Sequence, residues 1–173
     1  MKTKCPYCGH ENIAGSDHCE KCLHPFTQKD IPLPGKDKLQ KTIMTVPVRN
    51  FISKIPPIIV SPETPVQEVI EKMQALPTKG CVLICDSHKK LLGIASIRDI
   101  LLKVAGVVKD ASKFPVKNIM TPNPEYLDKD APLAYALHKM SIGKFRHVPV
   151  LDKGFPIGVV STRDLIENLT TRD

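Results

Sequence analysis

The sequence predicts an α/β fold in which two copies of one β-α-β-β-α unit pack on each other, preceded by a small cysteine-rich module. Two heptapeptides, 93–99 and 158–164, share the order Gly, two small apolar residues, Ser, any residue, Arg and Asp, and lie 65 positions apart. A unit present only twice cannot form an open solenoid, which needs at least three repeats. The cleft between two packed halves is therefore the expected ligand site. Further pairs extend the repeat at offsets of 67 or 68: Pro47 with Pro115, Pro65 with Pro132, and Met73 with Met140.

The composition indicates a globular protein with an aliphatic core and a basic surface. The 173 residues include no Trp and carry a formal net charge of +7, which falls to about +5 if four thiolates bind one divalent metal. The charge suits an anionic partner or a solvated surface, and both interpretations stay open. No apolar run approaches the roughly 18 residues that span a bilayer, and the first residues lack a signal-peptide apolar region. We therefore expect a cytoplasmic protein without membrane contact.

Four of the six cysteines form a metal-site pattern, CxxC followed by ten residues and a second CxxC: Cys5, Cys8, Cys19 and Cys22. Two such turns offer four sulfurs to one tetrahedral ion, with backbone N–H groups supporting the thiolates. Disulfides are the first alternative, but they rarely persist in a reducing compartment. A thioredoxin-like redox motif is the second, but the surrounding βαβ pattern is missing. Four protein ligands leave no open position, which favours a structural metal over a catalytic one.

Zinc is the expected ion, although iron also accepts four thiolates. The segment 5–26 resembles the short zinc-ribbon modules found at the ends of many prokaryotic proteins, except that Leu23 stands where such modules often have glycine. Three nearby histidines, His10, His18 and His24, are alternative ligands that the four cysteines make unnecessary. So few residues cannot fold by apolar burial alone, so the metal is expected to supply most of the stability of the module.

The first repeat begins after a proline-stiffened linker, 27–46, which leads us to expect that the repeats fold independently of the ribbon. Thr64 and Gln67 are placed to form a capping box around Pro65 at the start of a helix. Apolar residues then recur at spacings of three and four and predict one buried face: Val66, Val69, Ile70, Met73 and Leu76.

Two strands and a second helix complete the first repeat, and the second repeat follows the same order. The first repeat continues with strands 81–85 and 91–95 and a helix over 98–105, and Cys81 and Cys85 are interpreted as small buried apolar residues. The second repeat has Leu133, Leu137 and Met140 on its first helix, strands at 147–151 and 156–160, and Leu165, Ile166 and Leu169 on its last helix.

This order, the duplication and the two heptapeptides resemble a tandem pair of CBS domains, or Bateman module, over about residues 47–171. The stretches 119–122 and 146–150 also fit the family pattern in register. The resemblance implies halves packed sheet to sheet around a pseudo-twofold axis, with adenosine nucleotides such as AMP or ATP, or related adenosyl compounds, in the clefts. It also implies a regulatory protein without catalytic activity, and commonly a homodimer. The expected domains are a zinc ribbon (1–26), the linker (27–46), and two CBS domains (47–110 and 111–173).

Each heptapeptide, hereafter a signature, can bind a nucleotide or merely cap a helix. Ser-x-x-Asp is a capping box that needs no ligand, whereas the resemblance gives the Asp as the ribose-binding residue. The exposed N–H groups of a helix start, with Ser and Arg beside them, can face a phosphate. The candidates are Thr121, Lys144, Arg146, His147, Ser161, Arg163 and Asp164 in the second half, and Ser53, Lys79, Ser96, Arg98 and Asp99 in the first.

The two candidate sites are unequal. Gly80 and Cys81 stand in the first half where Arg146 and His147 stand in the second. Donors to phosphate are therefore denser in the second half, which we expect to bind more tightly. His147 is alternatively a histidine of the core.

The leading interpretation is an adenosyl-sensing regulatory protein that relays ligand binding to a partner through the zinc ribbon or a dimer face. No positioned nucleophile, Gly-rich phosphate loop or paired catalytic carboxylates are present, so no enzyme is expected. The alternative is a nucleic-acid-binding regulator that uses the ribbon. Three lysines and two aromatic residues in 1–26 are a thin platform for that role. A third interpretation, an iron-bound electron carrier, would be coloured.

Overall fold

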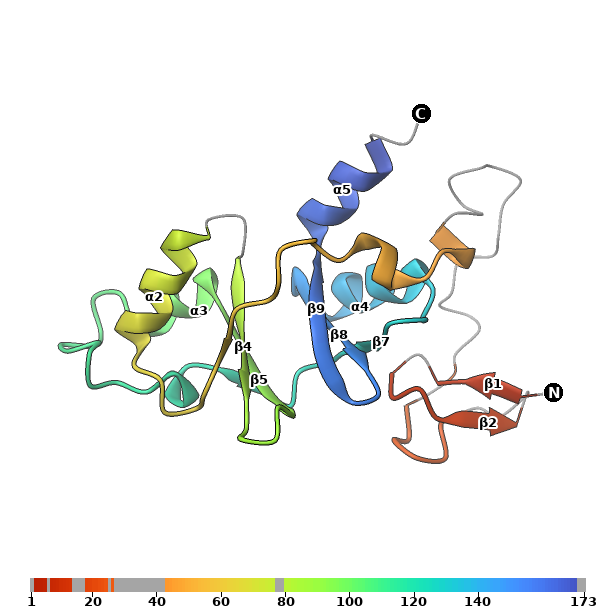
Figure 1. The fold of residues 1–173 in the computed structure, drawn as a ribbon, viewed down its shortest axis with the longest axis horizontal. Helices are drawn as coiled ribbons and strands as arrows, with labels where there is room; N and C mark the ends of the chain where they lie inside the picture. Colours follow the sequence, from red (N-terminus) through yellow and green to blue (C-terminus); the bar gives the residue numbers. More distant parts are fainter. Residues whose placement is uncertain are drawn as a thin grey trace. The chain divides into compact units, whose positions relative to one another are not determined.

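The computed structural model describes residues 2–5, 7–13, 18–24, 26, 43–76 and 80–170, without the side chains of residues 2, 3 and 168–170. The chain divides into two compact units (Figure 1). We call Ile55–Pro124 the first-repeat unit, and Met1–Lys54 together with Glu125–Asp173 the second-repeat unit. Most of the expected linker lies outside the described residues. Within the described residues, no helix is long and apolar enough to cross a membrane.

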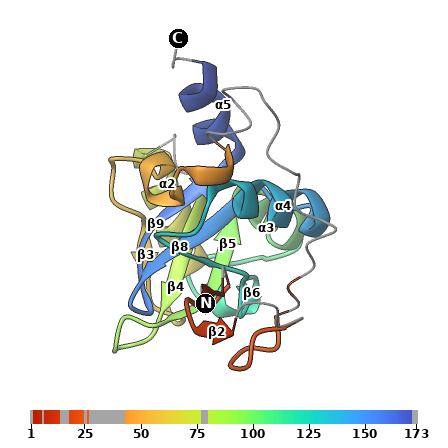
Figure 2. The same cartoon turned by 90° about the vertical axis from the view of Figure 1, so that its right-hand side faces the viewer.

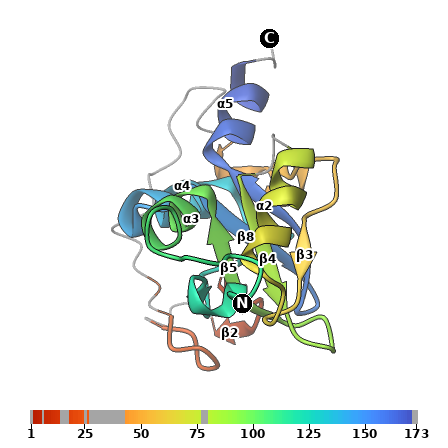
Figure 3. The ribbon, with the colours of Figure 1, turned by 90° about the vertical axis from the view of Figure 1, so that its left-hand side faces the viewer.

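The first-repeat unit contains a four-stranded sheet in the order β3-β4-β5-β6. Figure 3 shows strands β3, β4 and β5 with helices α2 and α3. Strand β3 pairs parallel with β4, and the other two pairs are antiparallel. Cys81 and Cys85 are buried, as the sequence predicts. The elements are β3 (Ile59–Val60), α2 (Val66–Ala75), β4 (Cys81–Cys85), β5 (Leu91–Ser96), α3 (Ile97–Lys103), the 3-10 helix η3 (Val116–Asn118) and β6 (Thr121–Pro122).

Helix α2 has the predicted buried face but not the predicted cap. Val66, Val69 and Met73 are buried. Pro65, not Thr64, is the N-cap residue, and no side chain caps the helix. The capping-box prediction was wrong because backbone carbonyls already accept from the first N–H groups of the helix, from Val66 to Phe114 at 2.8 Å and from Gln67 to Ala111 at 3.1 Å. The Thr64 hydroxyl instead accepts from the Ser61 N–H at 3.1 Å, and Gln67 donates to Glu71 at 3.0 Å.

The second-repeat unit contains a three-stranded sheet in the order β7-β8-β9, with α4 against β8. Figure 2 labels β8, β9 and α4 of this unit. The predicted strands are confirmed to within one or two residues. Leu133, Met140 and Leu165 are buried, but Ile166 is 65% exposed. The elements are the 3-10 helix η2 (Val48–Phe51), β7 (Leu127–Asp128), α4 (Leu133–Gly143), β8 (His147–Asp152), β9 (Phe155–Ser161) and α5 (Thr162–Thr170), together with the ribbon strands β1 (Lys2–Lys4) and β2 (Glu11–Ile13).

The opening segment of each repeat lies in the core of the opposite unit. Phe51 is fully buried beside Leu127 and Leu133 in the second-repeat unit. Ile119, its equivalent at an offset of 68, is buried in the first-repeat unit. The two spatial units therefore do not coincide with the two sequence repeats. The predicted domain boundaries, 47–110 and 111–173, describe the repeats and stay a prediction.

The glycine of each signature makes room for these exchanged segments. A Cβ added to Gly93 would lie 2.4 Å from the Met120 sulfur, and one added to Gly158 would lie 3.1 Å from Ile52. Met120 and Ile52 are equivalent positions at the offset of 68. The shared glycine is thus explained by packing, before any ligand is considered.

Candidate functional site

The four ribbon cysteines lie in two equivalent backbone turns, which we call knuckles. In each knuckle the N–H of the first cysteine donates to the carbonyl five residues later, and the N–H four residues later returns to the carbonyl of that cysteine. These bonds are Cys5 to His10 (2.8 Å), Gly9 to Cys5 (2.9 Å), Cys19 to His24 (2.8 Å) and Leu23 to Cys19 (2.8 Å). The second knuckle therefore has the geometry of the first although Leu23 replaces glycine, and both residues have positive φ, 72° at Gly9 and 57° at Leu23.

The knuckles bring the four sulfurs into one cluster. All four Sγ atoms lie within 4.8 Å of one another, and the Cys5–Cys22 and Cys8–Cys19 separations are both 3.6 Å. Tetrahedral Zn–S bonds of about 2.3 Å place sulfurs about 3.8 Å apart, so the donor set fits such an ion. Within the described residues, no histidine joins the cluster. The four cysteines can therefore hold a metal ion by themselves.

The local environment divides the thiols before a metal is considered. Burial raises the pKa of Cys5, and it raises the pKa of Cys8 to about 11. Burial also opposes ionisation of Cys19, but hydrogen bonds from the backbone N–H groups of Cys22 and Lys21 outweigh it and lower its pKa to about 6. Cys5 and Cys8 therefore need a cation to be thiolates at neutral pH, which is what a bound metal ion supplies.

The ribbon packs against β7 and α4 through an aromatic stack that the sequence did not indicate. The Tyr7 ring stacks on His24 with a centroid distance of 5.1 Å and on Tyr126 at 5.0 Å. The Lys139 ammonium lies 4.3 Å from the centroid of the Tyr7 ring and donates to Glu125 at 2.7 Å. Lys139 is only 5% exposed. Its spacing on α4 gave no sign of burial, because the ribbon that covers it is more than 100 positions away in the sequence.

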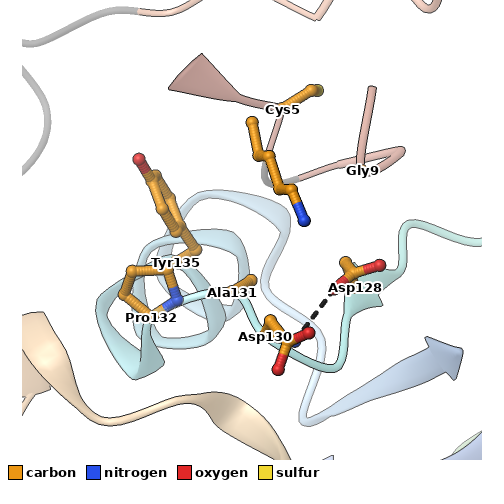
Figure 4. A pocket seen from close by; sticks show the side chains of 8 residues that line it. Cys5, Gly9, Asp128, Asp130, Ala131, Pro132 and Tyr135 are labelled. Carbon is orange, nitrogen blue, oxygen red and sulfur yellow. Dashed lines mark hydrogen bonds between the residues drawn. The ribbon is translucent and has the colours of Figure 1, made fainter. Parts of the chain in front are cut away.

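A small pocket lies beside this contact (Figure 4). At its floor the Asp130 N–H donates to Asp128 at 2.9 Å, and Asp130 also forms an ion pair with Arg49. Because its lining comes from both the ribbon and the second repeat, we assign the pocket to the junction between them. Its lining consists of Lys4, Cys5, Gly9, Asp128, Asp130, Ala131, Pro132 and Tyr135.

The signature of the first repeat forms a complete capping box at the start of α3. The Ser96 N–H and hydroxyl both donate to one carboxylate oxygen of Asp99, at 2.9 and 2.6 Å, and the Asp99 N–H donates back to Ser96 at 3.4 Å. Lys103 pairs with the other oxygen at 2.9 Å. Burial opposes ionisation of Asp99, but the bonds from Ser96 and Lys103 outweigh it and lower the pKa of Asp99. Both carboxylate oxygens of Asp99 are therefore engaged.

The signature of the second repeat forms the same box in different surroundings. Ser161 donates to Asp164 from its N–H at 2.9 Å and from its hydroxyl at 2.5 Å, and the Asp164 N–H returns a bond of 3.2 Å. His147 is paired with Ser161 across β8 and β9. Burial lowers the pKa of the half-buried His147, an effect that Asp164 opposes. By sequence, Asn168 stands at the position equivalent to Lys103.

The remaining candidates are spread over both units. Lys144, with a φ of 54°, ends α4, and Arg146 precedes β8; both are exposed. Arg163 and Arg98 are exposed on the first turns of α5 and α3. Thr121 lies on β6 of the first-repeat unit and Ser53 in the second-repeat unit, so each candidate set draws on both units. Lys79 lies outside the described residues. Nucleotide binding by these residues stays a prediction.

Comparison with known proteins identifies the domain type and confirms the predicted pair of repeats. The family model named CBS domain matches residues 48–106 and 116–171. A CBS domain-containing protein of Arabidopsis thaliana is 40% identical over 94 residues, which are 54% of this chain and 17% of that protein. The chain thus spans about a sixth of the length of this plant relative.

Two solved structures extend the comparison to three dimensions. The crystal structure of an uncharacterized conserved protein from Pyrococcus horikoshii matches 75% of this chain and 96% of its own, with a TM-score of 0.66 and 26% identity. A CBS domain pair crystallised in complex with 5'-methylthioadenosine and S-adenosyl-L-methionine matches 75% of this chain and 99% of its own, with a TM-score of 0.64 and 26% identity.

Proposed function

Because the chain belongs to the family of CBS-domain proteins, we propose that it is a regulatory protein that binds an adenosine nucleotide or a related adenosyl ligand at its signature residues. The observation that carries this proposal is the pair of Ser-x-Arg-Asp turns, each joining the end of a strand to the start of a helix. The similar domain pair crystallised with two adenosyl compounds supports it. The protein acts by binding, without a catalytic step of its own, and works in the cytoplasm.

The second-half signature supplies three kinds of contact for such a ligand. The Asp164 carboxylate accepts hydrogen bonds from the ribose diol. The N-terminus of α5 faces a phosphate or other anionic group, and the Ser161 hydroxyl donates to that group once it releases Asp164. Lys144, Arg146 and Arg163 neutralise its charge, and His147 adds a donor when its ring N–H faces the ligand.

The first half offers a weaker version of the same site. Lys103 occupies one oxygen of Asp99 at 2.9 Å, and it also donates to the Ile119 carbonyl at 2.6 Å. A ribose diol has to displace this lysine to reach both oxygens. Gly80 and Cys81 provide no side-chain cation in place of Arg146 and His147. We therefore assign tighter binding to the second half.

The ribbon holds one structural zinc ion through Cys5, Cys8, Cys19 and Cys22. Sulfur separations of 3.6 Å support a four-thiolate site. Elemental analysis separates zinc from iron, and a colourless protein with one equivalent of zinc is the expected result.

The protein partner is a second copy of the chain, as the family resemblance implies. Helix α3 supports such a contact because it buries no residue in the described structure and exposes Leu101 (62%) and Leu102 (66%). Analytical ultracentrifugation tests this, and replacement of both leucines by glutamate should convert a dimer to a monomer.

Thermal-shift screening tests the ligand proposal directly. AMP, ADP, ATP, NAD and S-adenosylmethionine are the test compounds, and a ligand that binds only the native state raises the melting temperature. A shift with any of them that Asp164→Ala abolishes supports the proposal. If none binds at millimolar concentration, the signatures are helix caps only.

A further inference from the structure

The face of the second repeat beneath the ribbon differs from the equivalent face of the first repeat. At an offset of 67, Tyr126 corresponds to Ile59, Tyr135 to Glu68, and Lys139 to Lys72. In the first repeat these residues face solvent: Ile59 is 46% exposed, and Glu68 and Lys72 form a surface ion pair at 3.4 Å. In the second repeat the lysine is buried and the two tyrosines are half-buried. Two copies of one scaffold have thus diverged at positions where the second repeat meets the ribbon.

The ribbon presents a matching face that depends on both knuckles. Tyr7 lies inside the first knuckle, where its N–H donates to the Cys5 sulfur at 3.3 Å, and His24 follows the second knuckle directly. The two rings stack almost parallel, with an interplanar angle of 7°. They come from separate turns of the chain. The sulfur cluster joins those turns, and so does the buried Asn12, whose amide donates to the His10 carbonyl at 2.8 Å and accepts from the Glu20 N–H at 2.9 Å. An ion shared by the four sulfurs therefore strengthens the arrangement of the ring pair that meets Tyr126 and Lys139.

From these observations we infer that the ribbon is a metal-dependent cover for the second repeat: ion binding assembles the Tyr7–His24 face, and that face docks on Tyr126, Tyr135 and Lys139. This inference rests on the proposed metal site. Metal binding and docking are linked, so each strengthens the other by the same factor. Loss of the ion releases the ribbon and exposes the Lys139 ammonium.

The covered face connects to the proposed ligand site through one helix. Tyr135 and Lys139 lie on α4, which ends at Lys144, one of the candidate anion contacts. Helix α4 therefore belongs both to the covered face and to the proposed ligand site, and the partner of the ribbon is the second repeat of its own chain.

The first experiment measures Zn²⁺ affinity of the full chain by competition with a chromophoric chelator. Tyr126→Ala removes the docking ring and leaves every metal ligand in place, and Ile59→Ala is the matched control on the first repeat. We expect Tyr126→Ala to weaken Zn²⁺ binding about five- to tenfold, since loss of a stacked aromatic pair is worth roughly a factor of ten or less. Ile59→Ala should leave the affinity within about twofold of the wild type.

A second variant pair guards against misfolding of Tyr126→Ala. Lys139→Met keeps the length of the side chain but removes the cation above Tyr7, and Lys72→Met is its control. We expect about a two- to fivefold loss of Zn²⁺ affinity for Lys139→Met alone. Equal affinities in all four variants and the wild type would overturn the linkage.

Tyrosine fluorescence and near-ultraviolet circular dichroism provide a readout of docking. The chain has no Trp and only three tyrosines, all at this junction. Tyr7→Phe keeps the stacked ring, so the remaining signal comes from Tyr126 and Tyr135. Removal of Zn²⁺ should change that signal and re-addition should restore it. An unchanged signal overturns the inference. Binding of less than one equivalent of Zn²⁺ by the wild type overturns the zinc proposal, whereas one equivalent with unchanged affinities overturns only the cover.

Discussion

The two repeats share one backbone plan and differ at equivalent positions that face outward. Asp99 and Asp164 cap their helices through the same three hydrogen bonds, but Asp99 is also held by Lys103 at 2.9 Å. Lys72 lies on the surface, whereas its counterpart Lys139 is buried beneath Tyr7. The core positions, in contrast, stay apolar in both copies. A duplicated fold can therefore keep its core packing while its exposed faces acquire separate tasks.

Loss of the metal should have the largest effect, and only on the second repeat. Cys19→Ala should abolish zinc binding because it removes one of the four sulfur ligands. The effect should be large because structural zinc contributes on the order of 10 kcal/mol to the folding of small modules. Hydrogen exchange should then accelerate in 7–24 and on α4 but not in the first-repeat unit. The repeats at 47–171 should keep a cooperative melt. Cys81→Ala is the control, since Cys81 is buried far from the cluster in sequence and lies outside it. Joint unfolding of the ribbon and of the repeats would contradict independent folding.

Truncation of the exchanged segments should come next in size. Phe51→Ala should destabilise the protein by about 3–5 kcal/mol, and its mirror Ile119→Ala by about 2–5 kcal/mol, because each leaves a cavity in a closed core. Although Phe51 belongs to the opening segment of the first repeat in sequence, its loss should increase exchange in β7–β9. Ile119→Ala should affect β3–β6. Urea unfolding gives the magnitudes, and hydrogen exchange gives the locations. Faster exchange in β3–β6 for Phe51→Ala, or in β7–β9 for Ile119→Ala, would contradict the division of the chain into these two units.

The signature aspartates should differ by a smaller amount. Asp164→Ala should weaken the tighter ligand-binding event about tenfold or more, roughly 1.4 kcal/mol, because it removes acceptors for the ribose diol. Asp99→Ala should affect a weaker event or none. Isothermal titration calorimetry with the ligand found by thermal shift measures both. A larger loss with Asp99→Ala would reverse the proposed asymmetry, which Lys103→Met should reduce by releasing Asp99.

The two knuckles allow the smallest and most local test. Leu23 has a φ of 57° and is 71% exposed, so it bears a left-handed backbone without compensating burial. Leu23→Gly should stabilise the ribbon by about 0.5–1 kcal/mol. The substitution removes the energetic penalty that an L-residue has in the left-handed conformation, and the larger conformational entropy that glycine loses on folding offsets part of this gain. Gly9→Ala should destabilise it, because the new Cβ would lie 3.1 Å from Asp128. Denaturant titration of the zinc-loaded protein measures both, and a destabilising Leu23→Gly would refute the strain.

Local pattern and duplication made much of the fold predictable from sequence. The spacing of Val66, Val69 and Met73 identified the buried face of α2, and the alternation and length of the apolar runs identified β4 and β8. The sulfur cluster was predictable because CxxC spacing fixes a local turn. These features depend on residues close together in the chain.

Contacts between distant segments were not predictable in the same way. The predicted capping box of α2 was wrong because the carbonyls of Ala111 and Phe114, some 45 positions away, accept the hydrogen bonds expected for the Thr64 side chain. The burial of Lys139 under Tyr7 and the insertion of Phe51 beside Leu127 also join segments far apart in sequence. One feature of the sequence does mark the covered face. At the offset of 67, the second repeat has Tyr135 where the first repeat has the surface residue Glu68.

The exchange of opening segments also imposes an order on synthesis and folding. The first-repeat unit is continuous in sequence, Ile55–Pro124, so all of its core leaves the ribosome in one stretch. The second-repeat unit is interrupted, and Phe51 has to wait for Leu127 and Val150 before it is buried. Domains fold as their sequence becomes available, and closing a long loop is slow. The nascent chain therefore completes its middle first, and its exposed N-terminal apolar segment is the part that a chaperone would meet.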